Sequence, residues 1–513
     1  MVSAVSVSAP DLRAGVQVDT LEENTPLLGR VDDESVMLVR SEGEVFAVAT
    51  SCTHYAGPLE RGVVEGQRVH CPLHHACFDL RSGLPSGPAM RPLQCYELQT
   101  IGSLVRVIRK LETPRETPLK SPSSVLIIGA GAAGTACAEK LRQLGYDEPI
   151  TLVSDEMRGP VDRPMLSKDY LAGKISQAQT SLGDADFYRA QGIDLVLGDA
   201  ARSIDAVSHE VRLVSGRTCT YGALLLATGS SPRRLGIAGA TAPHVLRLRS
   251  LADARTIIER SRPGARAVII GSSYLGLEVA AALRARDLHV AVVSEDSLPL
   301  GPVLGETLGR YLRALHEREG VRFLLGRRPT RIGAANVQLD DGSSVPADFI
   351  LVAIGVSPRS ELAQATGRLD LAGGVVVDEQ LRTAHSDVYV AGDIAAYPDA
   401  RSGERVRVEH WSVAVRQGQA VARSMLGQGT PFQDVPFFWS THYDTTLSYM
   451  GHAPRWDRLI ERGDPEDGLY MCGYERDGKV LAVISMGDDL ASLEAEIALR
   501  DGDDERLAVI LRG

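Results

Sequence analysis

The sequence predicts a multidomain protein with a β-rich N-terminal domain, an α/β middle part and a small α+β domain at the C-terminus. Its 513 residues are more than one hydrophobic core usually holds. Short apolar runs separated by turn residues fill residues 1–111, whereas strand-like and helix-like segments alternate after residue 124. Within this second part, the order strand, Gly-rich loop and helix occurs twice, beginning at Val125 and at Val268.

Composition and charge narrow the classes of function. The hydrophobic fraction of 44% and the charged fraction of 24% are those of an ordinary soluble globular protein. The net charge of −11 argues against nucleic-acid and membrane partners, because both select basic surfaces. The N-terminus lacks the pattern of a secretory signal, and no uninterrupted run of about 18 apolar residues exists. Seven scattered cysteines do not form a disulfide framework, so we expect a cytoplasmic protein.

Residues 112–124 are predicted to form a linker. Three prolines alternate there with polar and hydroxyl residues, a composition typical of a semi-rigid connection between domains. The β-rich segment 1–111 therefore forms a domain of its own.

Two Cys-His pairs in this first domain predict a metal centre. Cys52 and His54 are separated by one residue, and Cys71 and His74 by two. Such a set can bind zinc in a tetrahedron, or a [2Fe–2S] cluster with two Cys on one iron and two His on the other. Zinc ribbons usually pair Cys with Cys and His with His, whereas each pair here mixes the two. This arrangement resembles the Rieske domain family, which implies a Rieske [2Fe–2S] cluster held by these four residues, with zinc as the alternative.

The Rieske resemblance also carries an expectation about redox potential. High-potential members have an additional disulfide between the cluster loops, which this sequence lacks, and a Ser and a Tyr that donate to the cluster sulfurs. The aligned residues here, Ala76 and Phe78, carry no donor. Fewer hydrogen bonds to sulfur disfavour the reduced cluster, so we expect a potential at the low end of the Rieske range. His75 stands where the family usually has Gly.

The first Gly-rich loop predicts a dinucleotide site. It follows the apolar stretch that begins at Val125, and a helix is expected to follow it as far as about Leu144. Glycines permit the tight turn and the close approach of the backbone to a pyrophosphate. After the next strand, either Asp155 or Glu156 can bind the adenosine ribose. The loop positions expected to bind the cofactor are Gly129, Gly131, Ala132, Ala133 and Gly134.

Two further strand ends resemble those of two-dinucleotide-binding-domain flavoproteins. Ala227, Thr228 and Gly229 close one strand, and Gly392 and Asp393 close a much later one. The resemblance implies that the cofactor is FAD and that the Asp393 carboxylate binds its ribitol.

The segment from Pro160 to Lys168 is similar to a signature of the oxygenase-coupled ferredoxin reductases and the apoptosis-inducing-factor family. Val161 and Met165 depart from the signature, but its Arg and Lys are kept as Arg163 and Lys168. The resemblance implies that these two cations lie beside the flavin, where positive charge offsets the negative charge of its reduced form.

The second Gly-rich loop predicts a nicotinamide site, with Ser273 replacing the middle glycine. The strand that follows ends next to Glu295, and no Arg or Lys occurs from 294 to 300. An acidic residue suits a free ribose hydroxyl, so NADH is favoured over NADPH. The resemblance implies that Glu278 reaches the nicotinamide carboxamide and pairs with Lys168. Positions expected to contact either dinucleotide in this part of the chain are Gly271, Gly276, Glu278, Glu295 and Gly355.

The last part of the chain resembles the end of the same reductases. His410 and Trp411 are expected to bind the cofactor, and Trp439 is expected over the flavin–nicotinamide stack. A small sheet with a helix at about Leu490–Arg500 follows. The catalytic residues implied by the resemblance are therefore Lys168, Glu278 and Trp439.

Taken together, the chain resembles the Rieske-containing branch of the apoptosis-inducing-factor-like flavoproteins. The expected order is a Rieske domain (1–111), linker (112–124), FAD domain (125–240), NAD domain (241–356), second FAD segment (357–428) and reductase-type α+β domain (429–513). Such a chain is an NADH oxidoreductase that passes electrons through FAD to its own cluster. From there they would go to an external acceptor: an oxygenase, a cytochrome or a small molecule.

Two other functions remain open. A redox-responsive flavoprotein would bind NADH and change its association with partners, with little turnover. A complete Rieske oxygenase would need a mononuclear iron held by two His and a carboxylate, and no matching set is found among the 12 His. A homodimer is also kept open as an assembly.

Overall fold

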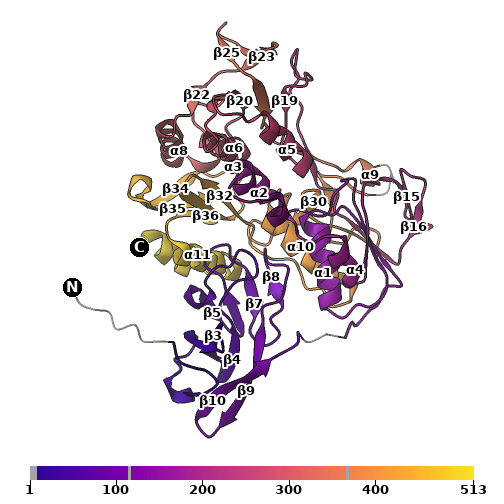
Figure 1. Cartoon of the computed structure of the whole chain (residues 1–513), viewed down its shortest axis with the longest axis vertical. Coiled ribbons are helices and arrows are strands. Elements are labelled where there is room, and N and C mark those ends of the chain that lie inside the picture. The colour runs from indigo at the N-terminus through magenta and orange to yellow at the C-terminus, as the bar shows by residue number, and fades with distance from the viewer. Residues whose placement is uncertain (1–8, 114–116, 365–368) are drawn as a thin grey trace.

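The computed structural model describes residues 9–113, 117–364 and 369–513. Residues 1–8 of the predicted first domain, 114–116 of the predicted linker and 365–368 of the second FAD segment lie outside the described residues. The chain forms an elongated body with the N-terminal β-rich domain at one end and the second α/β unit at the other (Figure 1). The first α/β unit and the C-terminal domain lie between them, so the predicted fold class is confirmed.

Two antiparallel sheets form the N-terminal domain. The larger sheet has the order β1 (Val16–Gln17), β10 (Leu104–Lys110), β9 (Cys95–Ile101), β4 (Glu44–Ala49), β3 (Glu34–Ser41) and β2 (Leu27–Val31). The smaller sheet contains β5 (Val63–Glu65), β6 (Arg68–His70), β7 (Cys77–Asp79) and β8 (Pro85–Ser86). Side chains alternate across strand β3, so that Met37 packs toward the smaller sheet and Leu38 toward the opposite face. The larger sheet is thereby covered on both faces.

A parallel five-stranded sheet forms the first α/β unit. Its order is β13 (Ile193–Val196), β12 (Ile150–Val153), β11 (Val125–Ile128), β17 (Ala223–Leu226) and β29 (Val388–Val390). Helices α1 (Ala132–Gln143) and α10 (Trp411–Met425) cross closely at Gly418. A Cβ at this position would lie 2.1 Å from the Ala133 carbonyl oxygen, so only glycine fits there. Shorter elements around this sheet are α2 (Arg163–Ser167), α3 (Asp169–Ala172), α4 (Ala185–Ala190), β14 (Ala201–Asp205), β15 (Glu210–Leu213), β16 (Thr218–Thr220), α9 (Glu361–Gln364), β28 (Val375–Val376), β30 (Ala395–Pro398) and β31 (Arg405–Val406).

The second α/β unit repeats this plan. Its parallel sheet has the order β19 (Val245–Leu246), β26 (Phe349–Val352), β20 (Arg266–Ile270), β21 (His289–Ser294) and β22 (Arg322–Leu325). The strands β18 (Ser230–Pro232) and β27 (Val356–Pro358) pair where the chain enters and leaves this unit. The unit also contains α5 (Leu251–Arg260), α6 (Tyr274–Arg284), α7 (Gly301–Leu304), α8 (Glu306–Arg318), β23 (Pro329–Ile332), β24 (Asn336–Leu339) and β25 (Ser344–Pro346).

The C-terminal domain is an antiparallel sheet with two helices. The strand order is β32 (Phe437–His442), β33 (Thr445–Gly451), β36 (Lys479–Met486), β35 (Leu469–Arg476) and β34 (Arg458–Asp464). The expected helix is present as α11 (Asp489–Asp501), and a further helix, α12 (Asp504–Arg512), was not predicted. Within the described residues, no helix is both long and apolar enough to span a membrane.

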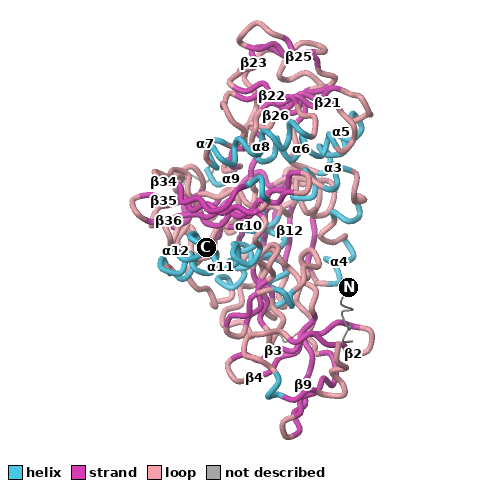
Figure 2. The backbone as a smooth tube through the Cα atoms, turned by 90° about the vertical axis from the view of Figure 1, so that its left-hand side faces the viewer, coloured by secondary structure: helices cyan, strands magenta, loops and turns pink. Residues whose placement is uncertain are grey.

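The N-terminal domain packs against the first α/β unit and the C-terminal domain. Figure 2 shows it next to α11 and below the first α/β unit. The loop 85–90 receives hydrogen bonds from the helices of that unit: Lys140 on α1 donates to the Pro85 carbonyl at 3.0 Å, and Gln419 on α10 donates to the Ala89 carbonyl at 2.8 Å. The two Cys-His loops lie on the same side of the domain, facing the rest of the chain.

Candidate redox site

The two predicted ligand loops, 52–57 and 71–76, share one backbone geometry. In each, the Cys amide donates to the carbonyl of the last loop residue, at 2.9 Å in the first loop and 2.8 Å in the second. The amide of the fifth residue donates back to the Cys carbonyl, at 2.9 and 3.1 Å. That fifth residue, Ala56 or His75, has a positive φ of 55° or 57°. The folded loops therefore present Cys52 and Cys71 from matching positions, whereas His54 is the third residue of its loop and His74 is the fourth.

The donor set and its burial fit a [2Fe–2S] cluster. The Cys52 and Cys71 thiols are free and buried. The imidazoles of His54 and His74 lie 5.2 Å apart, centroid to centroid, and both ring nitrogens of His54 are buried without a hydrogen-bond partner. A buried polar atom without a partner is unfavourable, and a metal bond would satisfy one of these nitrogens.

In the described part of the chain, no three His, Cys, Asp or Glu side chains gather as they would around one metal ion. A tetrahedral zinc needs four ligands at one point, whereas a Rieske cluster needs only one pair at each iron. The pairing of one Cys with one His in each loop suits the cluster better than zinc.

An aromatic cluster joins these loops to the rest of the protein. The Trp439 indole, on β32, lies 4.5 Å from the His74 ring and 5.6 Å from the His54 ring, centroid to centroid. Tyr55 stacks on His54 at 3.7 Å. Trp439 also lines a large cavity between the two α/β units and the C-terminal domain, so one side chain borders both the predicted ligands and that cavity.

The residue after each predicted His ligand forms a contact across the domain interface. The Tyr55 hydroxyl donates to Asp162 Oδ2 at 2.6 Å, in the loop before α2. His75 contacts helix α11 through both ring nitrogens: Nδ1 pairs with Glu496, and Nε2 lies 3.2 Å from the Ser492 hydroxyl. Burial would raise the pKa of Glu496, but Arg416 and His75 instead hold it at about 2. The two loops are thereby fixed to both of the domains behind them.

The cavity has a volume of about 730 Å³ and lies where the two α/β units meet the C-terminal domain. The sequence-predicted residues that line it are Gly129, Gly131, Ala132, Ala133, Asp155, Glu156, Arg163, Lys168, Ala227, Thr228, Gly229, Glu278, Gly392, Asp393, His410, Trp411 and Trp439. Those that do not line it are Gly134, Gly271, Gly276, Glu295 and Gly355.

The first Gly-rich loop shows three different reasons for glycine. Gly129 has a φ of 112°, and a Cβ there would lie 2.1 Å from the Ala227 carbonyl. A Cβ on Gly134 would lie 1.9 Å from the Gly129 carbonyl, so this residue serves packing within the wall. Around Gly131, by contrast, a Cβ would meet no atom within 4 Å. The backbone at Gly131 therefore faces open cavity, as a pyrophosphate site at the start of helix α1 requires.

The acidic residues after β12 are each held by an arginine. Glu156 pairs with Arg163 at 2.7 Å, and Asp155 pairs with Arg359 at 2.8 Å. Arg359, which also lines the cavity, was not predicted from the sequence as a site residue. Both acids line the cavity near the Gly-rich loop, so both stay candidates for the ribose.

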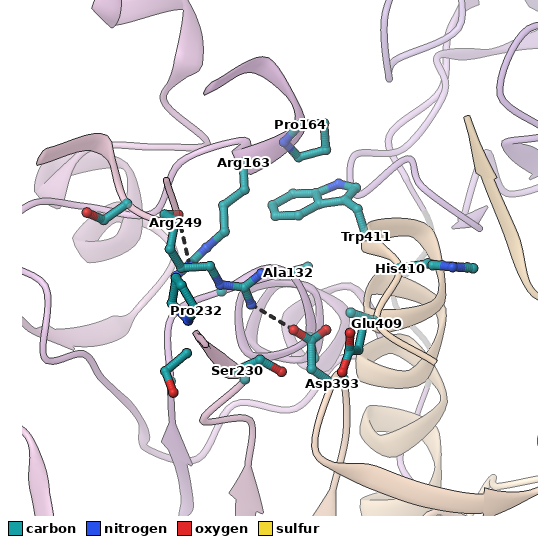
Figure 3. A pocket seen from close by; sticks show the side chains of 18 of the residues that line it. Ala132, Arg163, Pro164, Ser230, Pro232, Arg249, Asp393, Glu409, His410 and Trp411 are labelled. Carbon is teal, nitrogen blue, oxygen red and sulfur yellow. Dashed lines mark hydrogen bonds and ion pairs between the residues drawn. The ribbon is translucent and has the colours of Figure 1, made fainter. Parts of the chain in front are cut away.

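A further arginine that was missed, Arg249, pairs with Asp393 at 2.7 Å. Figure 3 shows this pair across the cavity, with the Trp411 indole near Arg163 and Pro164. Arg249 directly precedes Ser250, the N-cap of helix α5, at an Arg-Ser sequence that carries no recognisable motif.

Partly buried Lys168 and buried Glu278 form an ion pair on the wall of the cavity. Lys168 Nζ lies 2.9 Å from Glu278 Oε2, which also accepts a hydrogen bond from Ser167 at 2.6 Å. The other carboxylate oxygen accepts from the Ser440 hydroxyl at 2.7 Å. The pair predicted from the sequence is therefore present, although its serine partners were not foreseen.

The second Gly-rich loop differs from the first. Ser273 begins helix α6: its hydroxyl donates to the Ala353 carbonyl at 3.0 Å and accepts from the Gly276 amide at 3.4 Å. The serine that replaces the middle glycine thus caps the N-terminus of helix α6. Glu295, at the end of β21, pairs with the exposed Arg328 at 3.1 Å.

Comparison with known proteins places the three parts of the chain. Residues 14–97 match the Rieske [2Fe-2S] domain, residues 123–418 the pyridine nucleotide-disulphide oxidoreductase family, and residues 437–505 the reductase C-terminal domain. The Rieske match covers the two predicted metal loops, and the C-terminal match covers strand β32, which carries Trp439.

Two curated relatives illustrate the match. The chain is 33% identical to apoptosis-inducing factor 3 of Homo sapiens over 485 residues, which is 90% of this chain and 80% of that protein. It is 36% identical to the ferredoxin–NAD(+) reductase component of the anthranilate 1,2-dioxygenase system of Burkholderia cepacia, over 74% of this chain and 95% of that one.

A solved structure agrees with these relatives. The covalent complex of putidaredoxin reductase with putidaredoxin has a TM-score of 0.72 at 31% identity, over 74% of this chain and 94% of that chain. These domains together imply FAD and a Rieske cluster. The chain therefore belongs to the pyridine nucleotide-disulphide oxidoreductase family, as a ferredoxin reductase-like oxidoreductase that carries its own Rieske [2Fe–2S] domain.

Proposed function

We propose that this protein passes electrons from NADH, through FAD, to the Rieske cluster of its own N-terminal domain, and from there to an external one-electron acceptor. The observation that carries the proposal is the position of Trp439. Its indole lies 4.5 Å from the ring of the predicted ligand His74 and also lines the cavity. One side chain thus separates the two proposed redox centres.

The residues of the cavity suit a bound FAD. The open backbone at Gly131 suits the pyrophosphate, and Asp155 or Glu156 suits the adenosine ribose. Asp393 stays our candidate for the ribitol, although Arg249 now shares its carboxylate. Bound FAD would supply the conversion of a two-electron hydride donor into single electrons.

Lys168 and Glu278 are proposed as catalytic residues. The Lys168 ammonium places a partly buried positive charge at the cavity wall, where it favours added negative charge. Glu278 holds that ammonium in place. Hydrogen bonds from the Ser167 and Ser440 hydroxyls orient the two carboxylate oxygens of Glu278. Together with Trp439, these residues would orient the nicotinamide.

NADH is proposed as the electron donor because of Glu295. A carboxylate at the end of β21 accepts from a free ribose hydroxyl and repels a 2′-phosphate. Arg328 pairs with this carboxylate at 3.1 Å on the surface. The ratio of kcat/KM for NADH and NADPH measures the preference, and we expect Glu295→Ala to reduce it.

Docking of the two centres within one chain removes the need for a separate ferredoxin in the first step. A tethered acceptor has a high effective concentration that does not change when the protein is diluted. The external acceptor would then take electrons from the cluster; an oxygenase, a cytochrome and a small molecule all remain candidates.

Dilution tests the proposal. Oxidised holoprotein is mixed anaerobically with excess NADH in a stopped-flow instrument, and cluster reduction is followed in the visible range at several protein concentrations. We expect a rate constant that is independent of protein concentration. A rate that rises in proportion to protein concentration would mean that the cluster is reduced by other molecules, and the proposed internal path would be wrong.

A further inference from the structure

A continuous line of buried hydrogen bonds leads from the cavity toward the surface. It begins at Glu278, whose carboxylate accepts from the Ser440 hydroxyl at 2.7 Å. That hydroxyl lies 3.1 Å from His442 Nε2, and His442 Nδ1 lies 3.3 Å from His316 Nε2. The line ends at Tyr443, whose hydroxyl lies 3.4 Å from His316 Nδ1. Both histidines thus use both of their ring nitrogens.

The line crosses two domains. Ser440 and His442 lie on β32 of the C-terminal domain, whereas His316 lies on helix α8 of the second α/β unit, which Figure 2 places above the C-terminal sheet. Ser440, His442 and His316 are fully buried, and Tyr443, in the turn after β32, is partly exposed. The inner end of the line therefore touches the cavity and the outer end touches solvent.

Both histidines are neutral near pH 7. Burial, and next the positive charge of Lys168, lowers the pKa of His442 to about 3. Burial, and next His442, lowers the pKa of His316 to about 2. A neutral imidazole has one N–H donor and one acceptor nitrogen, so such rings can join a directional line of hydrogen bonds. At the outer end, Glu319 and Arg284 are the charged groups that act on Tyr443.

The line can be satisfied in two directions. In one, every group donates toward Glu278, starting with the Tyr443 hydroxyl. In the other, both imidazoles take the opposite tautomer, each hydroxyl turns round, and a protonated Glu278 is the inner donor. The second arrangement holds one proton more than the first, on Glu278. When each group passes a proton outward and the Tyr443 hydroxyl releases one to solvent, the second arrangement becomes the first and Glu278 is ionised again.

The proposed reaction needs such a path. Oxidation of one NADH by two one-electron acceptors gives one NAD⁺, two reduced acceptors and one proton. An iron–sulfur cluster that is reduced takes up the electrons only, so the proton that came with the hydride must leave a buried site.

We propose that Glu278, Ser440, His442, His316 and Tyr443 form the route by which this proton reaches solvent. The inference rests on the proposed function. It adds a role for two histidines that neither bind the cofactors nor line the cavity.

Chemical rescue tests the route. Turnover of NADH with excess ferricyanide, which accepts electrons without protons, is followed in weak buffer with a pH-indicator dye. We expect His316→Ala to slow proton release by roughly tenfold or more, and added imidazole to restore it by occupying the space left in the line. His289→Ala is the matched control, because this exposed residue of the same unit lies outside the line, and its rate should be unchanged with or without imidazole.

A second readout does not depend on turnover. The ¹⁵N NMR spectrum of histidine-labelled holoprotein reports the tautomer of each ring, and Tyr443→Phe removes only the outer hydroxyl. We expect neutral His316 and His442 in the native protein and a changed His316 tautomer in this variant. If both variants turn over and release protons at native rates while the native protein reduces its cluster with NADH, the proton route is wrong and the proposed function stands. If NADH does not reduce the native cluster, the proposed function itself is wrong.

Discussion

The two sides of the Trp439 indole differ in how they are filled. On the side of the N-terminal domain, the rings of His54, Tyr55 and His74 lie within 6.0 Å of it, and contacts such as that of His75 with Glu496 hold the two domains together. On the other side, the indole borders a cavity of about 730 Å³ with charged walls.

The difference matches what each side would exchange. A packed contact with no room for a ligand suits the passage of electrons alone. An open cavity with glycine backbone and buried charges suits the binding and release of a nucleotide. Changes on the packed side should therefore alter the cluster or its reduction, and changes on the open side should alter the reaction with NADH.

Loss of a predicted cluster ligand should have the largest effect. Cys71→Ser removes one of two thiolates, and we expect it to abolish the visible absorption and the EPR signal of the Rieske cluster while NADH still bleaches the flavin. Cys95→Ser is the control, because this cysteine is equally buried in the same domain but lies outside the ligand loops. A native cluster signal in Cys71→Ser would mean that the ligand assignment is wrong.

The next effect is expected on the open side. Glu278→Gln removes the negative charge that pairs with Lys168 at 2.9 Å. We expect flavin bleaching by NADH to slow by roughly 100-fold, while dithionite still reduces the cluster fully. Glu317→Gln changes a carboxylate of a surface pair and should behave as the native protein. An unchanged rate in Glu278→Gln would show that the pair does not assist the reaction with NADH.

A smaller effect is expected from the docking contacts. His75→Gly suits the positive φ of 57° but removes the bonds to Glu496 and Ser492, each contributing about 1 kcal/mol. We expect cluster reduction by NADH to slow by up to about tenfold, with flavin bleaching unchanged. Tyr55→Phe removes only the bond to Asp162 and should show a weaker slowing. Native rates in both variants would show that these contacts do not set the position of the cluster.

The smallest effect concerns the potential of the cluster. Ala76→Ser adds a hydroxyl beside the second ligand loop. If it donates to a cluster sulfur, a bond of about 1 kcal/mol raises the midpoint potential by roughly 40 mV. A redox titration followed by EPR measures the shift. A potential that is unchanged or lower would contradict the explanation of the expected low native value.

Local patterns predicted the parts of the site that lie close together in sequence. The mixed Cys-His pairs and the glycines of the first loop carry their chemistry within a few residues. The ion pairs on the cavity wall join residues that are far apart in sequence. Arg249 and Asp393 are 144 residues apart, and Arg359 and Asp155 are 204 residues apart. Only the folded sheets bring these side chains together, so no local spacing could indicate them.

The docking of the domains could be predicted least. His75 stood out only as a departure from the Rieske pattern, and its partner Glu496 lies 421 residues further along the chain. Helix α12 was also missed, although Asp503 caps its start and Leu507, Ile510 and Leu511 follow with helical spacing. Its brevity and its place at the chain end weakened that pattern.

An anaerobic titration of the purified holoprotein with NADH tests the central claim most directly, with the flavin followed by visible absorbance and the cluster by low-temperature EPR. We predict that the flavin bleaches and that the signal of a reduced Rieske cluster grows with it. Bleaching of the flavin with a cluster that stays oxidised, or zinc in place of iron, would contradict the internal electron path. The function would then lie in a change of association when NADH binds.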